Sequence, residues 1–221
     1  MKRILLIFFV AIQLCSCTIY RTIHFNADRS GNMETKVDFT ALMTMMQQEE
    51  GGTNELGSMK DMSSLNNTKT ILEGIPGITN VQNSFDTTGI ITTSYDFNSV
   101  EALVKSMSAG DQTSQMMGMG GSANSKSPIK ITYTKKKFMM VEMDKKTLAD
   151  LKKEGLGGGK AGEMEMALSS SSYNTTIHFP ETIRKVSYKN ASITNDKSVN
   201  FSLPFKEYLS EDYKPLIINF K

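Results

Sequence analysis

The stretch TIYRTIHFNADRSGNMETKVDF, residues Thr18–Phe39, carries the pattern that decides the fold. In its first half, every second residue would lie on the same face of a β-strand. These residues are Ile19, Arg21, Ile23 and Phe25. Asn26–Asn32 is rich in turn-forming residues, and Met33–Phe39 is typical of a returning strand. The sequence therefore predicts a β-hairpin here.

The same strand–turn–strand pattern, followed by a helical stretch, recurs along the chain about four times in all. The predicted strands cover residues 19–25, 33–39, 78–86, 89–97, 129–134, 138–144, 175–179, 183–188, 198–203 and 216–220. The predicted helical segments cover residues 41–48, 145–153, 205–209 and a helix ending at Met107 with Asn98 or Ser99 as its cap. This order predicts an α+β fold, in which an antiparallel sheet built from ββα units is covered on one face by short helices.

One tetrapeptide occurs twice, because Thr22–Phe25 and Thr176–Phe179 both read TIHF. The spacing between the ββα units is uneven, so a solenoid is excluded. We interpret the repeat as a sequence that suits a strand rather than as a sign of duplication.

Three segments are too rich in Gly and Ser to fold alone. They lie near residues 51–67, 108–127 and 154–162, and the second also contains several methionines. Such compositions are typical of mobile loops. We expect these loops to be candidates for contact with a partner.

The N-terminus has the features of an export signal. Lys2 and Arg3 precede the apolar run Ile4–Leu14, whose eleven residues are too few to span a membrane, which takes about 20. The run ends in Leu14-Cys15-Ser16-Cys17, which resembles a bacterial lipobox. The sequence therefore predicts a signal peptide over 1–16, cleavage between Ser16 and Cys17, and a lipid-anchored domain over 17–221.

Cys17 is the better of two possible lipid acceptors. Acylation of Cys15 would place Leu14 before the cut, where a small residue is required, whereas Cys17 is preceded by Ser16. Cleavage would remove Cys15, and the thioether would occupy Cys17, which leaves no thiol for a disulfide or a metal. The loss of Lys2 and Arg3 would leave 23 basic and 23 acidic residues, a balance that favours neither nucleic acid nor an anionic membrane surface as a partner.

Parts of the chain resemble the LppM-like bacterial lipoprotein domain family. The resemblance rests on residues 22–39, on Tyr173–Pro180 with Ile183–Tyr188, and on Asn195–Pro204, where Phe201 occupies the usual Trp position. Residues 51–137 have no counterpart in the pattern. The resemblance implies an envelope-anchored α+β domain without established chemistry, and a link to lipid or glycolipid handling.

The search for chemistry gives few candidates. No Gly-x-Ser-x-Gly motif occurs, and both histidines, His24 and His178, alternate with apolar residues in predicted strands. They would meet if their strands paired, but two imidazoles without a third ligand make a poor zinc site. The glycine-rich Gly155–Lys160 lacks the Ser or Thr that follows the lysine of a nucleotide-binding loop, and the turn Lys135–Lys137 is typical of a solvated hairpin tip.

We therefore expect a non-catalytic, lipid-anchored protein of the bacterial cell envelope that binds a partner protein or an amphiphile. It would use no cofactor, nucleotide or nucleic acid, and we favour the outer membrane, facing the periplasm. Two alternatives remain, an envelope enzyme with an unrecognised site and a copper-binding lipoprotein. In the second, thioethers such as Met116, Met117 and Met119 would bind Cu(I).

Overall fold

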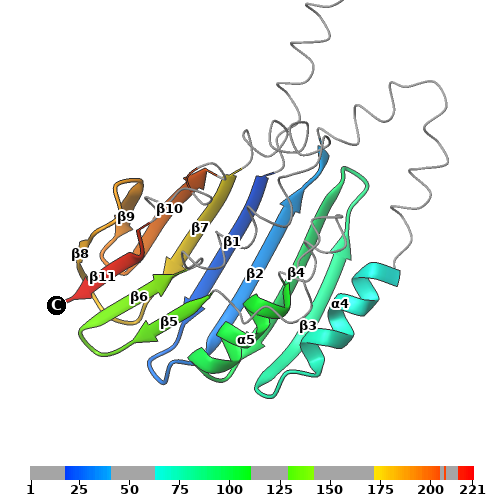
Figure 1. The fold of residues 1–221 in the computed structure, drawn as a ribbon, viewed down its shortest axis with the longest axis horizontal. Coiled ribbons are helices and arrows are strands. Elements are labelled where there is room, and N and C mark those ends of the chain that lie inside the picture. The colour runs from blue at the N-terminus through cyan, green and yellow to red at the C-terminus, as the bar shows by residue number, and fades with distance from the viewer. Residues whose placement is uncertain (1–17, 41–62, 111–128, 142–171, 205–206, 208–213) are drawn as a thin grey trace, which may run out of the picture.

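The computed structural model describes residues 18–40, 63–110, 129–141, 172–204, 207 and 214–221 (Figure 1). In this part of the chain the strands are β1 (Thr18–Phe25), β2 (Gly31–Asp38), β3 (Ile78–Phe85), β4 (Ile90–Phe97), β5 (Lys130–Tyr133), β6 (Lys137–Val141), β7 (Ser172–His178), β8 (Ile183–Val186), β9 (Ala191–Asn195), β10 (Ser198–Pro204) and β11 (Leu216–Phe220). The helices are α4 (Ser63–Glu73) and α5 (Val100–Gly110).

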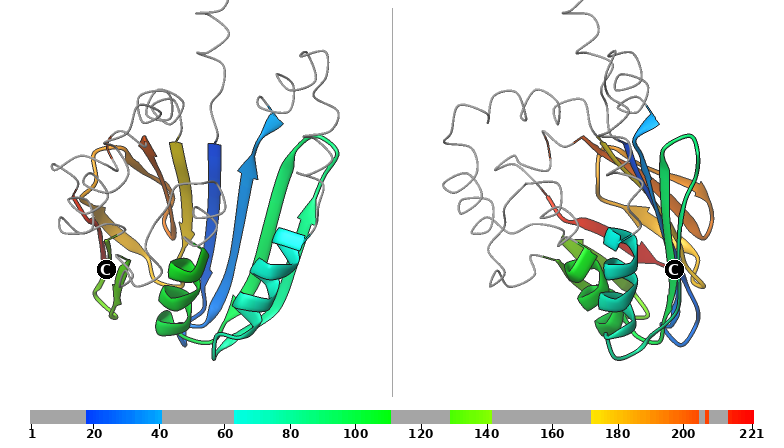
Figure 2. Two further views of the ribbon diagram at one scale, coloured as in Figure 1. Left: turned by 45° about the vertical axis from the view of Figure 1, so that its right-hand side comes forward. Right: turned by 90° about the vertical axis from the view of Figure 1, so that its right-hand side faces the viewer.

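The strands form two sheets. Sheet A has seven strands in the order β3-β4-β2-β1-β7-β10-β9, and sheet B has four in the order β5-β6-β11-β8. Sheet B and both helices lie on the same side of sheet A, as the right-hand view of Figure 2 shows. The α+β class is confirmed, with the difference that a second sheet shares the covering layer with the helices.

Among the described strands all pairs are antiparallel except one, so the predicted antiparallel sheet is mixed at the centre of sheet A. There β1 pairs with β7 in parallel, although β7 begins far along the chain at Ser172. The two TIHF tetrapeptides lie side by side in this pair, with Ile23 opposite Ile177 and His24 opposite His178. The repeat therefore marks two equivalent positions on neighbouring strands.

The structure contains most of the strands predicted in the four ββα units, but not every predicted helix falls within the described residues. The pairs β1–β2, β3–β4 and β5–β6 are confirmed, as are β7, β8, β10 and β11 and the helix ending near Met107. Strand β9 was not predicted. The predicted helices 41–48 and 145–153 lie outside the described residues, as does all of 205–209 except Glu207.

Two of the predicted loops are shorter than expected at one end. Helix α4 begins at Ser63, inside the segment 51–67, and α5 continues to Gly110, inside the segment 108–127. Ser63–Asn67 is therefore helical despite its polar composition. The rest of both segments, and all of 154–162, lies outside the described residues.

The core fills the space between sheet A and its covering layer. Its centre is a cluster of aromatic rings drawn from both sheets: Phe25, Phe97, Tyr133, Phe138, Phe179 and Phe220. Phe25 and Phe179, the last residues of the two TIHF segments, stack with their centroids 5.8 Å apart. Complete burial of a large apolar side chain contributes roughly 1.5–3 kcal/mol, so this cluster holds the two sheets together.

Helix α5, together with α4, covers the β3–β4 end of sheet A. The Ser99 hydroxyl accepts a hydrogen bond from the Ala102 backbone N–H at 3.2 Å, which caps the helix start. Leu103 and Met107 are buried beneath the helix. The hydroxyl of Ser106 lies 2.8 Å from that of Tyr95 on β4, and burial raises the pKa of Tyr95 to about 12.

Candidate functional site

The open side of sheet A carries a broad polar surface. Because paired residues point to the same side of a sheet, the strand register places these side chains in three rows across the five central strands. The rows are Asp96, Asn32, His24, His178 and Ser198; Ser94, Glu34, Thr22, Thr176 and Asn200; and Thr92, Lys36, Tyr20, Asn174 and Ser202. We call this surface the polar face.

Most residues of the polar face carry hydroxyl or amide groups, and its charged side chains each have a partner. Lys36 and Glu34 form an ion pair at 2.9 Å, and Asp96 accepts a hydrogen bond from the Asn80 side-chain amide at 2.7 Å. Tyr20 lies in the third row, on the central one of these five strands, and is 47% exposed. This surface can exchange many directed hydrogen bonds with a ligand and offers one aromatic ring for contact.

The two histidines meet on this face. The parallel register sets His24 opposite His178, and their rings stack with centroids 4.0 Å apart and planes inclined by 10°. Nδ1 of His178 lies 2.7 Å from the hydroxyl oxygen of Ser198, which is buried. The sequence suggested that the histidines would meet if their strands paired, and this is what the fold does.

The surroundings of the pair favour neutral imidazoles. Partial burial lowers the pKa of His24 below 6.5, and the negative charge of Glu34 opposes this effect. Partial burial also lowers the pKa of His178, and the neighbouring His24 lowers it further because two imidazolium ions would repel each other. A neutral pair can both donate and accept hydrogen bonds near neutral pH.

The chemistry open to this cluster is limited by its ligand set. Among the described residues, no group of three or more His, Cys, Asp or Glu side chains is placed to hold a metal ion. The contact between Ser198 and His178 joins a hydroxyl to a base, the two group types of a nucleophilic pair. The described hydrogen bonds of His178 include no carboxylate that would orient its ring.

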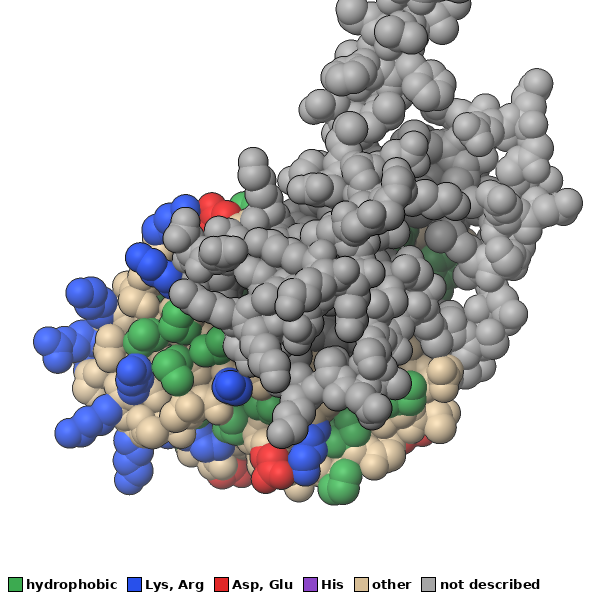
Figure 3. Space-filling model, viewed as in Figure 1, with side chains coloured by type: hydrophobic (Ala, Val, Ile, Leu, Met, Phe, Trp, Pro, Cys, Tyr) green, Lys and Arg blue, Asp and Glu red, His purple; other side chains and the backbone are tan. Residues whose placement is uncertain are grey.

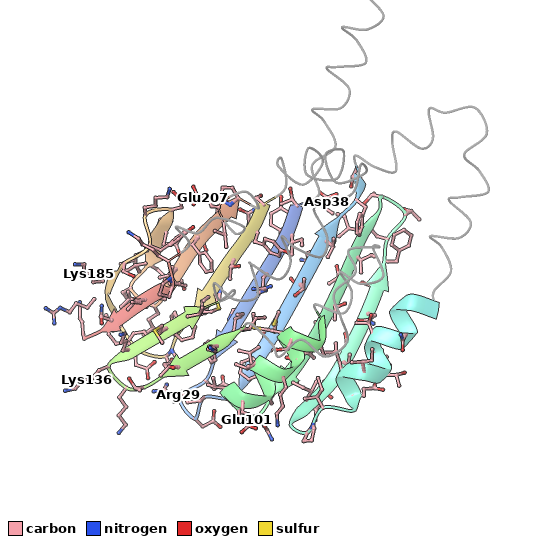
Figure 4. The ribbon with its side chains drawn as sticks, viewed as in Figure 1. Arg29, Asp38, Glu101, Lys136, Lys185 and Glu207 are labelled. Carbon is pink, nitrogen blue, oxygen red and sulfur yellow. The ribbon has the colours of Figure 1, made fainter. Side chains whose placement is uncertain are left out.

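A second polar cluster joins the two sheets. The guanidinium of Arg29, in the β1–β2 turn, lies 2.6 Å from one Glu181 oxygen and 3.8 Å above the centroid of the Tyr133 ring. The Tyr133 hydroxyl donates a hydrogen bond of 2.6 Å to the other Glu181 oxygen. Burial and the carboxylate raise the pKa of Tyr133, so its hydroxyl stays protonated and remains a donor. Figure 4 shows Arg29 at this end of the β1–β2 hairpin.

The other site residues predicted from the sequence lie outside the described residues. These are the cleavage and lipidation residues Ser16 and Cys17 and the methionines Met116, Met117 and Met119. Strand β1 begins at Thr18, immediately after Cys17. No helix in the described segments is long and apolar enough to cross a membrane.

Sequence reasoning missed the polar face as a unit and the Arg29–Tyr133–Glu181 cluster. The alternation in each strand signalled the outward residues, but their common surface depends on the order of strands in the sheet. Arg29 and Glu181 lie in turns, and nothing in the sequence links these two turns.

No protein-family model matches the chain, and no curated protein matches it. Among solved structures, the chain is similar to the NMR structure of the folded domain of the Mycobacterium tuberculosis LppM protein. The TM-score is 0.44 and the sequence identity is 9%, over 93% of this chain and 89% of that chain. The likeness is one of distant fold alone.

Proposed function

We propose that this chain is a bacterial envelope lipoprotein, anchored through Cys17, whose non-catalytic domain binds a partner protein through the polar face. The anchor would lie in the outer membrane with the domain in the periplasm. The observation that carries the binding role is Tyr20, a half-exposed aromatic side chain set among hydroxyl and amide groups on an open sheet face. Aromatic residues surrounded by polar groups are enriched at protein interfaces.

The position of the first strand supports the two parts of the proposal together. Tyr20 lies in β1, three residues after Cys17. Acyl chains on Cys17 would therefore hold the polar face close to the membrane surface, where a neighbouring envelope protein can reach it. An acyl chain would find few apolar contacts on this face, which favours a protein over the tail of an amphiphile.

The anchor is tested by metabolic labelling with palmitate. We expect the wild-type chain and a Cys15→Ser variant to take up label, because cleavage removes Cys15 in both. A Cys17→Ser variant should take up none and should leave the membrane fraction. Label retained by Cys17→Ser, or lost from Cys15→Ser, would show that the acceptor is assigned wrongly.

The binding role is tested with a photo-crosslinking amino acid at Thr176, which lies on the polar face next to β1. We expect a discrete crosslinked protein, and we expect Tyr20→Ala to weaken its capture about tenfold or more. Ile193→Ala is the matched control, because Ile193 is 45% exposed but lies on the edge strand β9. Equal capture by both variants would contradict the proposal.

A second candidate function follows from the contact between Ser198 and His178. An envelope enzyme could use this pair as nucleophile and base, with His24 beside it. Purified protein should then be labelled at Ser198 by a phosphonate that reacts with activated serines, and Ser198→Ala should not be labelled. Absence of labelling in the wild-type protein favours the binding role.

A further inference from the structure

One end of sheet B gathers positive charge. Asn219 on β11 pairs with Lys137 on β6 and with Lys185 on β8, so both lysines flank it on the outward side of the sheet. With strands about 4.8 Å apart, the row Lys137–Asn219–Lys185 spans about 10 Å. Lys135 and Lys136 form the adjoining turn, and Arg184 precedes Lys185. We call Lys135, Lys136, Lys137, Arg184 and Lys185 the basic end.

These five side chains are exposed, and they form no ion pair within the described residues. The four strands of sheet B and the β5–β6 turn contain no acidic residue. Nearby carboxylates in the described residues have other roles: Glu181 is bound by Arg29 and Tyr133, and Glu207 by Lys189. Asp196, whose backbone carbonyl accepts the Ile183 N–H, is another acidic residue near β8.

Three lysines outside sheet B are paired instead. Lys36, Lys69 and Lys105 each form an ion pair with a glutamate, namely Glu34, Glu73 and Glu101. The five residues of the basic end leave 25 − 5 = 20 basic against 23 acidic residues in the rest of the chain, so the near-neutral total conceals a local positive charge. Figure 4 shows Lys136 and Lys185 pointing outward at one end, whereas Glu101 lies at the start of α5.

Apolar side chains lie next to the basic end. Met139 and Ile217 pair with each other and are partly exposed. On the outward face of sheet B they form the row next to Lys137 and Asn219. Their neighbours Phe138 and Ile218 point into the core, so Met139 and Ile217 face outward. Figure 3 shows a hydrophobic patch at this end of the molecule with Lys and Arg side chains around it.

We propose that the basic end binds the anionic phospholipid headgroups of a membrane surface, with Met139 and Ile217 resting against the interface. Clustered lysines beside a small apolar patch match a surface that is negative outside and apolar beneath. Lys137 and Lys185 lie on either side of Asn219 in one row across sheet B, and a spread row of positive charges suits many phosphates on a surface better than one small anion. The inference rests on the proposed envelope location, and it adds a preference for anionic lipid that acyl chains do not have.

The test measures sedimentation of the full chain carrying Cys17→Ser with lipid vesicles, so that acyl chains make no contribution. We expect binding to vesicles of phosphatidylcholine that contain about 30 mol% of the anionic lipid phosphatidylglycerol, weakening as salt rises, and no binding to phosphatidylcholine alone. Each lysine near such a surface contributes roughly fivefold, so the triple variant Lys136→Gln, Lys137→Gln, Lys185→Gln should bind about 100-fold more weakly.

The matched control is Lys69→Gln, Lys105→Gln on α4 and α5, which should bind as the parent does, whereas Lys137→Gln, Lys185→Gln, which changes the net charge equally, should bind roughly 25-fold more weakly. Equal loss in both variants, or equal binding to both kinds of vesicle, would overturn the proposal. So would binding to an acidic protein or to nucleic acid without binding to the anionic vesicles. Loss of palmitate labelling would refute the anchor alone, since the vesicle experiment uses the unacylated chain.

Discussion

Gly31 opens β2 at a point where the backbone of β1 leaves no room for a side chain. A Cβ atom there would overlap the carbonyl oxygen of His24 and lie 2.7 Å from Cζ of Phe97. Because both neighbours belong to packed strands, we expect Gly31→Ala to lower the free energy of unfolding by about 2–3 kcal/mol in urea denaturation.

Gly74→Ala is the control for this effect. A Cβ atom at Gly74 would lie 3.4 Å from its nearest neighbour, the Ile71 carbonyl oxygen, which is ordinary contact. We expect a change of less than about 1 kcal/mol. If the two variants were equally stable, this result would contradict the close approach of β1 to β2 at Gly31.

The stacked histidines make stability depend on pH. In the unfolded chain both imidazoles titrate near 6.5, whereas in the folded chain partial burial lowers the pKa of each. Below pH 6.5 the unfolded state therefore binds more protons, and stability falls as the pH decreases through this range. We expect the urea midpoint to be lower at pH 5.5 than at pH 7.5.

The chain contains only these two histidines, so the effect can be isolated. The double variant His24→Asn, His178→Asn should show the same midpoint at both pH values. Asp28 and Asp86 have lowered pKa values because their carboxylates accept hydrogen bonds within their turns. They therefore affect stability only in solutions more acidic than both of these. A wild-type midpoint that does not change between the two pH values would contradict the burial of the pair.

At the scale of elements, the Arg29–Tyr133–Glu181 cluster fastens sheet B to the hairpin β1–β2. Tyr133→Phe would remove the donor to Glu181 and leave the partly buried carboxylate with Arg29 as its partner. A hydrogen bond to a charged group contributes about 1.5–3 kcal/mol, and we expect a loss of this size in urea denaturation. Tyr20→Phe is the control. It removes an exposed hydroxyl group from sheet A and should change the free energy of unfolding little.

The elements predicted from the sequence are those whose own pattern is strong. The strands of β1–β2 and β3–β4 alternate clearly, and their turns contain Asp28 and Asp86, whose carboxylates accept the hydrogen bonds that close them. Helix α4 was missed because SSLNNTKTILE is poor in helix formers, and its packing on β3 and α5 stabilises it. Strand β9 was missed because its mostly exposed residues do not alternate between apolar and polar. It forms through antiparallel pairing with β10.

At the scale of the whole molecule, the features that could not be predicted from the sequence depend on pairing between strands that are far apart in the chain. The parallel contact of β1 with β7 brings His24 to His178 and assembles the polar face, and no local pattern specifies that contact. The separation of charge has the same origin. A neutral total predicted no attraction to an anionic surface, whereas the order of strands in sheet B collects lysines that are distant in the chain.

The same pairing predicts that the N-terminal part does not fold alone. A chain that ends at residue 171 would keep β1–β6 but lack β7, β10 and β11. The edge of β1 would be unpaired, and Phe25 would lose the stacked ring of Phe179. We expect this fragment to show no cooperative urea transition by circular dichroism, in contrast to the full chain. A cooperative transition in the fragment would show that β1–β6 is a domain by itself.

The distance along the chain between β1 and β7 also sets an order in time. Thr18 pairs with Ser172, so the first strand to be made waits for 154 further residues before its parallel neighbour exists. At a synthesis rate of about 5–20 residues per second, that wait is roughly 10–30 s. During it the edge of β1 that later pairs with β7 is open, so β1 can pair with other chains and promote aggregation until the C-terminal third has been made.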